Sequence, residues 1–268
     1  MVLWKMKPVL PSLSIVVVTH NRSELLKRAL SSILKCAKDG YEIILCADDS
    51  SAETIEVAKN FLRAQDSFIR IPSMRGPAES RNIGAKVARG KWILFVDDDD
   101  TFGDQHIDEI LAILPEEKNK VLYFNYKRVV ESREGPPFIQ LDSKLMDISN
   151  RDPVELLIRN FIPMHALVFS AELFARHAFD SQLQSHEDWD FLISLLTSGA
   201  DFEWVDCGRS DGVVVHIDAS STSRNRVADT ALDYLSIYRK WPATDMSIKQ
   251  VRSNLLDCMG IKIDCGAL

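Results

Sequence analysis

The stretch Trp92-Ile-Leu-Phe-Val-Asp-Asp-Asp-Asp100 decides the fold class of this chain. Its five apolar residues, 92–96, predict a strand that is buried on both faces. Four consecutive aspartates then end the strand and gather negative charge at one edge of a sheet. Neighbouring carboxylates raise one another's pKa unless a cation neutralises them, and hard oxygen ligands suit Mg²⁺ or Mn²⁺. The alternative is a solvated acidic turn that caps the next helix.

Upstream of this strand, the hydrophobic pattern alternates between strand and helix. Apolar runs at 13–18, 43–47 and 68–71 predict strands, and amphipathic stretches after each of them predict helices, the third beginning at Gly76-Pro77. This order predicts an α/β fold with a mostly parallel central sheet flanked by helices. Ligands of such sheets bind at the carboxyl ends of the strands. Polar clusters follow three of the predicted strands, at 19–21, 48–49 and 97–100.

Glycine-rich phosphate-binding loops are absent from the sequence. No G-x-G-x-x-G follows the first predicted strand, and no G-x-x-x-x-G-K-[ST] occurs in the chain. The sequence therefore disfavours a dinucleotide site and a P-loop. A metal ion together with an arginine is the expected neutraliser of a bound phosphate.

Composition limits the compartment and the partners. The 268 residues include 32 Lys and Arg against 39 Asp and Glu, a net charge of −7, which disfavours a general nucleic-acid binder but leaves a local basic site open. Five cysteines without CxxC spacing predict free thiols in a reducing compartment, and we therefore expect a cytoplasmic protein. No apolar run approaches the roughly 20 residues that span a bilayer, so any membrane contact is expected to be peripheral.

The second half of the chain is less regular. Residues 121–130 predict one long strand, and 131–150 predict a loop or an insertion near the acceptor. Residues 163–169 precede a short predicted helix, and 213–216 predict a strand that ends in His216. His186-Glu-Asp-Trp-Asp190 opens an amphipathic helix, where acidic side chains are ordinary partners of the helix dipole.

The sequence from Val227 onward predicts two helices. Their favoured use is core packing or formation of a homodimer. The alternative is contact of Arg239, Lys240 and Trp241 with a lipid surface on the inner face of a membrane.

Four motifs resemble those of family 2 glycosyltransferases with the GT-A fold. They are SIVVVTHNR at 14–22, CADDSS at 46–51, RGPAESRNIG at 75–84 and ARGKWILFVDDDD at 88–100, and the resemblance extends over roughly 13–220. It implies a Rossmann-like GT-A domain over 1–224, with a donor half at about 11–102 and an acceptor half at about 103–224. A helical C-terminal extension over 225–268 would follow it.

The resemblance implies a nucleotide-sugar site in the first half. Asp49, with Asp48 beside it, would recognise the base, usually uracil; alternatively, one of the pair caps the following helix. Arg81 would lie near the base and the diphosphate, or would form a structural pair with Glu79 or Asp48. The complete set of donor-binding residues implied in this way is Thr19, His20, Asn21, Asp48, Asp49, Arg81, Asp97 and Asp98.

The resemblance also implies the metal-binding, catalytic and acceptor residues. Asp97, Asp99 and His216 would hold Mn or Mg, and Asp98 or Asp100 could share that duty. Asp188 would be the catalytic base, and Glu187 would orient it or contact the acceptor. The residues expected on the acceptor side are His165 and Trp189.

Together these features predict a metal-dependent, inverting glycosyltransferase. The expected donor is a UDP-linked sugar, and the expected acceptor is a saccharide or a lipid-linked saccharide of surface polysaccharide or glycoconjugate synthesis. One alternative is a nucleotidyltransferase that forms sugar nucleotides, although such enzymes usually carry a glycine-rich loop after the first strand. A second alternative is a non-catalytic module that binds a nucleotide or a cation.

Overall fold

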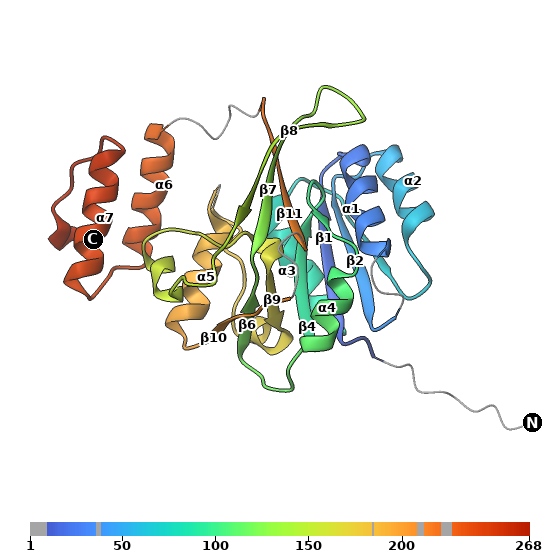
Figure 1. The fold of residues 1–268 in the computed structure, drawn as a ribbon, viewed down its shortest axis with the longest axis horizontal. Helices are drawn as coiled ribbons and strands as arrows, with labels where there is room; N and C mark the ends of the chain where they lie inside the picture. Colours follow the sequence, from blue (N-terminus) through green and yellow to red (C-terminus); the bar gives the residue numbers. More distant parts are fainter. Residues whose placement is uncertain (1–9, 36–38, 184, 208–211, 221–226) are drawn as a thin grey trace, which may run out of the picture.

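Two sheets and a C-terminal helical extension make up the protein (Figure 1). The computed structural model describes residues 10–35, 39–183, 185–207, 212–220 and 227–268. Cys46, Cys207, Cys258 and Cys265 are free thiols, whereas Cys36 lies outside the described residues. No helix in the described part of the chain is both long and apolar enough to cross a membrane.

The larger sheet has seven strands in the order β10-β6-β9-β4-β1-β2-β3. β9 runs antiparallel to its neighbours β4 and β6, and the other pairs are parallel, which confirms the predicted mostly parallel sheet. Every residue of β1 and β2 is buried, so their apolar sequences reflect cover on both faces. The strand bounds are β1 Leu13–Thr19, β2 Tyr41–Asp48, β3 Ser67–Ile71, β4 Trp92–Asp97, β6 Lys120–Tyr123, β9 Leu167–Ser170 and β10 Asp201–Trp204.

Helices follow the strands in the order that the hydrophobic pattern predicts. α3 begins at Gly76, where φ is +82°, with Pro77 in its first turn. A Cβ on Gly84 would lie 2.3 Å from Cγ1 of Val16, so the absence of a side chain lets α3 pack closely against β1. The helices of the main domain are α1 Ser23–Lys35, α2 Ala52–Phe61, α3 Gly76–Val87, α4 His106–Ile113 and α5 Glu187–Thr197.

The smaller sheet corrects two of the sequence-based predictions. Residues 121–130 are not one strand, because β6 ends at Tyr123 and β7 starts the second sheet at Tyr126. Residues 131–150 are not a loop, because β8 pairs antiparallel with β7. β8 is exposed along nearly its whole length, so its sequence lacks the alternation of a half-buried strand. The sheet order is β5-β11-β7-β8, with bounds β5 Thr101–Phe102, β7 Tyr126–Ser132, β8 Ile139–Met146 and β11 Val213–Asp218.

Short 3₁₀ turns lie between the strands in the second half of the chain. The helix predicted after 163–169 is the turn Ala171–Ala175. Further turns cover Pro153–Leu157 and Met164–Ala166, and the latter leads directly into β9.

The C-terminal extension consists of α6 (Val227–Lys240) and α7 (Met246–Cys258). These helices share a second hydrophobic core with α5, to which Trp189, Ile193, Tyr238 and Leu256 contribute. Arg252 is fully buried there, and it donates hydrogen bonds to the carbonyl oxygens of Leu157 (2.7 Å) and Trp241 (2.8 Å). The favoured core-packing role of this segment is thereby confirmed.

Candidate functional site

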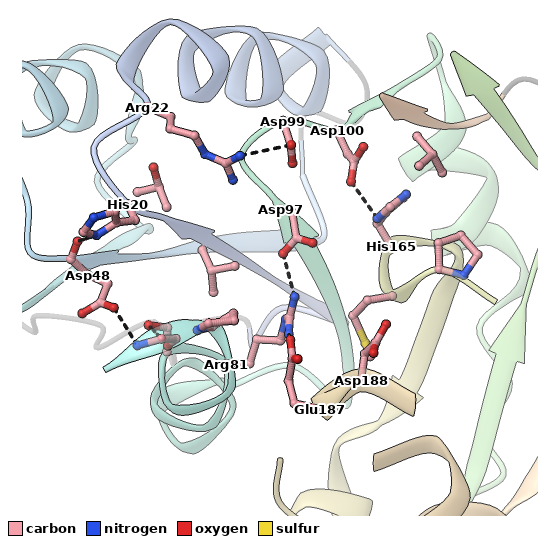
Figure 2. A pocket seen from close by; sticks show the side chains of 18 of the residues that line it. His20, Arg22, Asp48, Arg81, Asp97, Asp99, Asp100, His165, Glu187 and Asp188 are labelled. Atoms are coloured by element: carbon pink, nitrogen blue, oxygen red, sulfur yellow. Dashed lines mark hydrogen bonds and ion pairs between the residues drawn. The ribbon is translucent and has the colours of Figure 1, made fainter. Parts of the chain in front are cut away.

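A cavity of about 570 Å³ lies at the carboxyl ends of β1, β2 and β4 (Figure 2). α3, the start of α5 and β11 complete its walls. Both halves of the chain therefore contribute to it. The predicted site residues that line it are Thr19, His20, Asp48, Arg81, Asp97, Asp99, His165, Glu187, Asp188 and His216.

Arg81 joins the two halves of this cavity. Its guanidinium donates to Oδ1 of Asp97 and to Oε1 of Glu187, at 2.8 Å each (Figure 2). The Arg81 side chain is only 5 % exposed, whereas the Asp97 side chain is 32 % exposed, so the guanidinium is shielded from water while Asp97 remains open to the cavity. Burial favours the neutral form of Asp97, but the Arg81 cation, aided by His165, holds the pKa of Asp97 below its usual value. The structural partners considered from the sequence for Arg81, Glu79 and Asp48, are wrong.

Asp188 lies beside Glu187 at the start of α5. Its Oδ2 accepts a hydrogen bond from Nδ2 of Asn160 (3.1 Å), and its Oδ1 accepts one from the backbone N–H of Trp189 (2.7 Å). Burial, and then the negative charge of Glu187, raise the pKa of Asp188. A fixed carboxylate with a raised pKa is a competent proton acceptor. Asn160 was not predicted, because it lies in an irregular segment without a motif.

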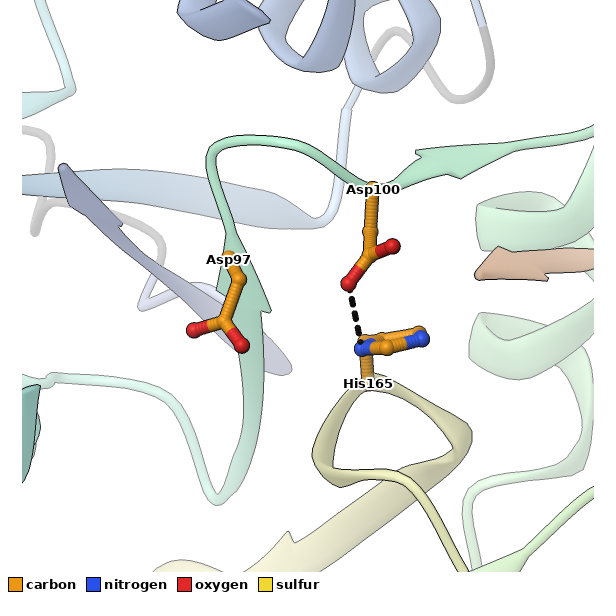
Figure 3. Close-up of side chains that lie close together, drawn as sticks. All are labelled: Asp97, Asp100 and His165. Atoms are coloured by element: carbon orange, nitrogen blue, oxygen red, sulfur yellow. Dashed lines mark ion pairs between the residues drawn. The ribbon is translucent and has the colours of Figure 1, made fainter. Parts of the chain in front are cut away.

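Asp97, Asp100 and His165 form a candidate metal site (Figure 3). One ligand atom from each residue lies within 4.8 Å of the others, and Nδ1 of His165 is 3.0 Å from Oδ2 of Asp100. Two carboxylates suit Mg²⁺ or Mn²⁺, and the imidazole nitrogen favours the transition ion. The donor set therefore fits a divalent cation. Asp97 is the one member of the predicted metal set that belongs to this described cluster.

Asp99 and His216, the other predicted ligands, line the cavity but have other partners. Oδ2 of Asp99 accepts hydrogen bonds from Arg22 (3.1 Å) and Arg133 (2.9 Å). The two ring nitrogens of His216 lie 2.9 Å from Oγ1 of Thr101 and 2.9 Å from Oε2 of Glu131, and burial lowers the pKa of the ring. The candidate cluster contains instead Asp100, which the sequence left open as a residue that shares metal binding, and His165, which was expected on the acceptor side.

Two arginines near Asp99 were missed. Arg22 stands in the first of the four motifs and lines the cavity, but it had no assigned role. Arg133 lies in the stretch that was predicted to be a loop, so its contact with Asp99 had no local signal.

The predicted base-recognition residues separate in the structure. The carboxylate of Asp48 accepts hydrogen bonds from the backbone N–H groups of Arg75 (2.9 Å) and Gly76 (2.8 Å). It therefore holds the start of α3, whereas the sequence suggested a cap on the helix after β2. Asn21, whose Oδ1 accepts from the Ser51 N–H (2.6 Å), does not line the cavity. Asp49 is exposed and does not line it either.

Asp98 is buried, which corrects its predicted contact with the donor, whereas Trp189 is buried and also contributes to the lining of a second cavity described below. Asp98 accepts a hydrogen bond from Oγ1 of Thr19 (2.5 Å) and pairs with Arg22. Burial raises the pKa of Asp98 to about 6, against the effect of the Arg22 cation. Trp189 is fully buried, and its indole N–H donates to the carbonyl of Leu156 (2.6 Å).

The sequence of this chain matches a known family model and several curated proteins. The family model described as "Glycosyl transferase family 2" matches residues 14–180. An uncharacterized glycosyltransferase of Haemophilus influenzae is 30% identical over 186 residues, which cover 69% of this chain and 62% of that protein. The GalNAc(5)-diNAcBac-PP-undecaprenol beta-1,3-glucosyltransferase of Campylobacter jejuni is 27% identical over 185 residues, 66% of this chain and 58% of that protein. The chain spans about three fifths of the length of these relatives.

Solved structures share the fold at lower sequence identity. S. aureus TarS 1-349 superposes with a TM-score of 0.63 at 16% identity and covers 91% of this chain, which in turn covers 70% of it. The complex of the same protein with UDP gives a TM-score of 0.62 at 19% identity, with the same coverage. The likeness confirms the predicted GT-A architecture.

Proposed function

This chain belongs to glycosyl transferase family 2, and we propose that it transfers a sugar from a nucleotide-sugar donor to a saccharide or lipid-linked saccharide acceptor with inversion. One observation carries the proposal: Arg81 connects Asp97, at the end of β4, with Glu187, which precedes Asp188. TarS has been solved with UDP and with UDP-GlcNAc, and the name of the Campylobacter relative includes an undecaprenol-linked saccharide. These names favour a UDP-linked donor and a membrane-derived or polymeric acceptor.

Asp188 acts as the general base in this proposal. The acceptor hydroxyl gives its proton to the Asp188 carboxylate while its oxygen attacks the anomeric carbon. The bond from that carbon to the diphosphate oxygen breaks, and the nucleoside diphosphate leaves with the electron pair. Asn160 holds Oδ2 of Asp188 in place, and the raised pKa strengthens the base. General-base catalysis of this kind is typically worth about 10²–10⁴-fold.

Cationic side chains balance the charge that develops on the diphosphate. Arg81 is held between two carboxylates, and Arg22 lines the same cavity with 45% of its side chain exposed. Mn or Mg, held by Asp97, Asp100 and His165, would supply Lewis-acid stabilisation of the leaving diphosphate. Fixed charges in a cavity shielded from water stabilise a transition state more strongly than solvent does.

A panel of UDP-, GDP- and dTDP-linked sugars tests this function. Purified protein is incubated with each donor and a set of saccharide acceptors, with Mn²⁺, Mg²⁺ or EDTA, and released nucleoside diphosphate and glycosylated product are measured. We expect one donor class to give both products. In a parallel incubation with nucleoside triphosphates and sugar phosphates, release of pyrophosphate would instead identify a nucleotidyltransferase. UDP binding without turnover of any donor would identify a non-catalytic module.

A further inference from the structure

A second cavity of about 300 Å³ adjoins the first, with which it shares Pro163, Val215 and Ile217. Four aromatic side chains, those of Tyr126, Phe161, Trp189 and Tyr234, form much of its apolar lining; the remaining residues used below are Arg128, Asn160 and His186. Concave sites with aromatic walls and a few convergent polar groups are the usual form of small-molecule sites. Its composition suits the apolar face of a sugar or polyol.

The second cavity reaches the proposed base. Asn160 lines it and donates the 3.1 Å hydrogen bond to Oδ2 of Asp188. His186, which also lines it, immediately precedes Glu187 and Asp188. A molecule seated in this cavity therefore lies next to Asn160 and can direct a hydroxyl group toward Asp188.

Arg128 places an unbalanced positive charge in this cavity. Its Nε is buried without a hydrogen-bond partner, and no carboxylate in the described part of the chain forms an ion pair with it. By contrast, Glu131, which lies on the same strand β7 as Arg128, forms ion pairs with both Arg28 and Arg133. Arg128 is half-buried, and of its guanidinium nitrogens only Nε is buried without a partner, so the cation is open to a partner from outside the chain.

The strand register adds a second cation. Lys144 on β8 stands directly opposite Arg128 on β7, so both side chains project from the same face of the sheet. Like charges directly opposite one another destabilise a sheet. Lys144 is exposed and lies outside the lining of the second cavity, and it forms no ion pair among the described residues. This basic pair is unexpected in a chain with a net charge of −7.

We propose that the second cavity is the acceptor site and that it selects a saccharide or polyol bearing an anionic group, a phosphate or a carboxylate, which Arg128 and Lys144 bind. The inference rests on the proposed function and specifies the chemical class of its acceptor. The sugar or polyol lies against the aromatic walls, the anion lies against Arg128 on the side of Lys144, and the reacting hydroxyl is directed past Asn160 toward Asp188, which lines the adjoining cavity.

Calorimetric titration with glucose, glucose 6-phosphate and glucuronate tests the inference. The protein is first saturated with UDP and Mn²⁺, so that the donor cavity is filled. We expect the wild type to bind at least one anionic probe about tenfold or more tightly than glucose, the scale of a charge-assisted hydrogen bond. The double variant Arg128→Gln/Lys144→Gln should bind all three probes alike. Lys127→Gln is the matched control, because Lys127 is the neighbouring residue of β7 and projects from the other face.

The outcomes separate this inference from the function on which it rests. Preference for glucose 6-phosphate identifies a phosphate-bearing acceptor, and preference for glucuronate identifies a carboxylate-bearing one. Equal binding of the three probes by the wild type, or an anion preference that survives in the double variant, overturns the inference. Release of nucleoside diphosphate from the donor panel is measured in parallel. If donor turnover is present while anion preference is absent, only the acceptor inference fails; if donor turnover is absent, the proposed function fails.

Discussion

Replacing Asp188 with Asn should lower sugar transfer by at least about 10²-fold, the lower end of the range for a general base. The amide has nearly the same size and can still accept the hydrogen bond from the Trp189 N–H, but it cannot take the acceptor proton. Donor affinity should persist, because Arg81 contacts Asp97 and Glu187 rather than Asp188.

The effect on stability should be small by comparison. Asp188 lies in the first turn of α5, where a negative charge stabilises a helix by about 0.3–1 kcal/mol. Its removal also relieves repulsion from Glu187, which raises the pKa of Asp188 in the wild type. The two effects oppose each other, so the net change in the free energy of unfolding should stay within about 1 kcal/mol. Such a change leaves the protein folded and cannot account for a hundredfold loss of turnover.

The deciding assay is turnover of folded variant at saturating donor with a true acceptor. Asp190→Asn is the matched control: Asp190 lies two residues further along α5 and binds Lys240 (2.9 Å) and Trp241 (2.8 Å) instead of lining the cavity. The control should lose stability and keep its turnover. Near-normal turnover of the Asp188 variant would refute the reasoning and direct attention to Glu187.

The pH dependence of wild-type transfer offers an independent test of the same base. A raised pKa means that Asp188 becomes protonated at a higher pH than an ordinary aspartate. The rate should therefore fall as the pH is lowered, and the midpoint of this fall should lie above about 3.9, the usual pKa of an aspartate. Glu187→Gln removes the second cause of the raised pKa and should move this acid limb to lower pH, while burial still holds it above the ordinary value. A limb that does not move would exclude the charge of Glu187 as a cause.

Three further substitutions probe the metal cluster, the buried arginine and the C-terminal extension. Asp100→Asn should abolish manganese-dependent UDP binding in calorimetry, whereas Asp99→Asn, which loses a carboxylate already paired with two arginines, should retain most of it; equal losses would contradict the assignment. Arg81→Leu leaves two carboxylates without their buried cation and should lower the free energy of unfolding in urea by about 3 kcal/mol. Arg252→Met leaves two carbonyls unpaired, which should lower the free energy of unfolding by about 1–3 kcal/mol per carbonyl. Limited proteolysis should then begin in the C-terminal helices; unchanged resistance to the protease would count against a stabilising role of Arg252.

Buried strands and their carboxyl ends were predictable from the sequence. β1, β2 and β4 are continuous apolar runs because helices cover both faces of the sheet, and that pattern is local. Because ligands bind at the carboxyl ends of the strands, the sequence predicted that residues such as Thr19, Asp48 and Asp97 line one cavity, although it did not predict their contacts.

The different positions of the four aspartate side chains were not predictable from strand geometry. Alternation along a strand would place Asp97 and Asp99 on one face. The strand ends at Asp97, however, and the N–H of Asp100 donates to the carbonyl of Asp97 (3.1 Å), which closes a turn. Asp97 and Asp100 therefore meet across the turn, while Asp98 points into the protein.

His165 belongs to the candidate metal cluster because of the tertiary structure. β9 returns antiparallel beside β4, so the turn Met164–Ala166 that precedes it lies next to the end of β4. No local pattern encodes that neighbour. The burial of Trp189 has a similar origin, because the helices that cover it belong to the distant C-terminal extension.

Arg81 shows how packing far from the chemistry determines the site. The absence of a side chain on Gly84 lets α3 lie against Val16 of β1, and Asp48 holds the first turn of the same helix. These two contacts place Arg81 where it reaches both Asp97 and Glu187. A diphosphate that binds Arg81 must then compete with those carboxylates for the guanidinium. In the proposed function, one buried cation therefore couples donor binding to the position of the base.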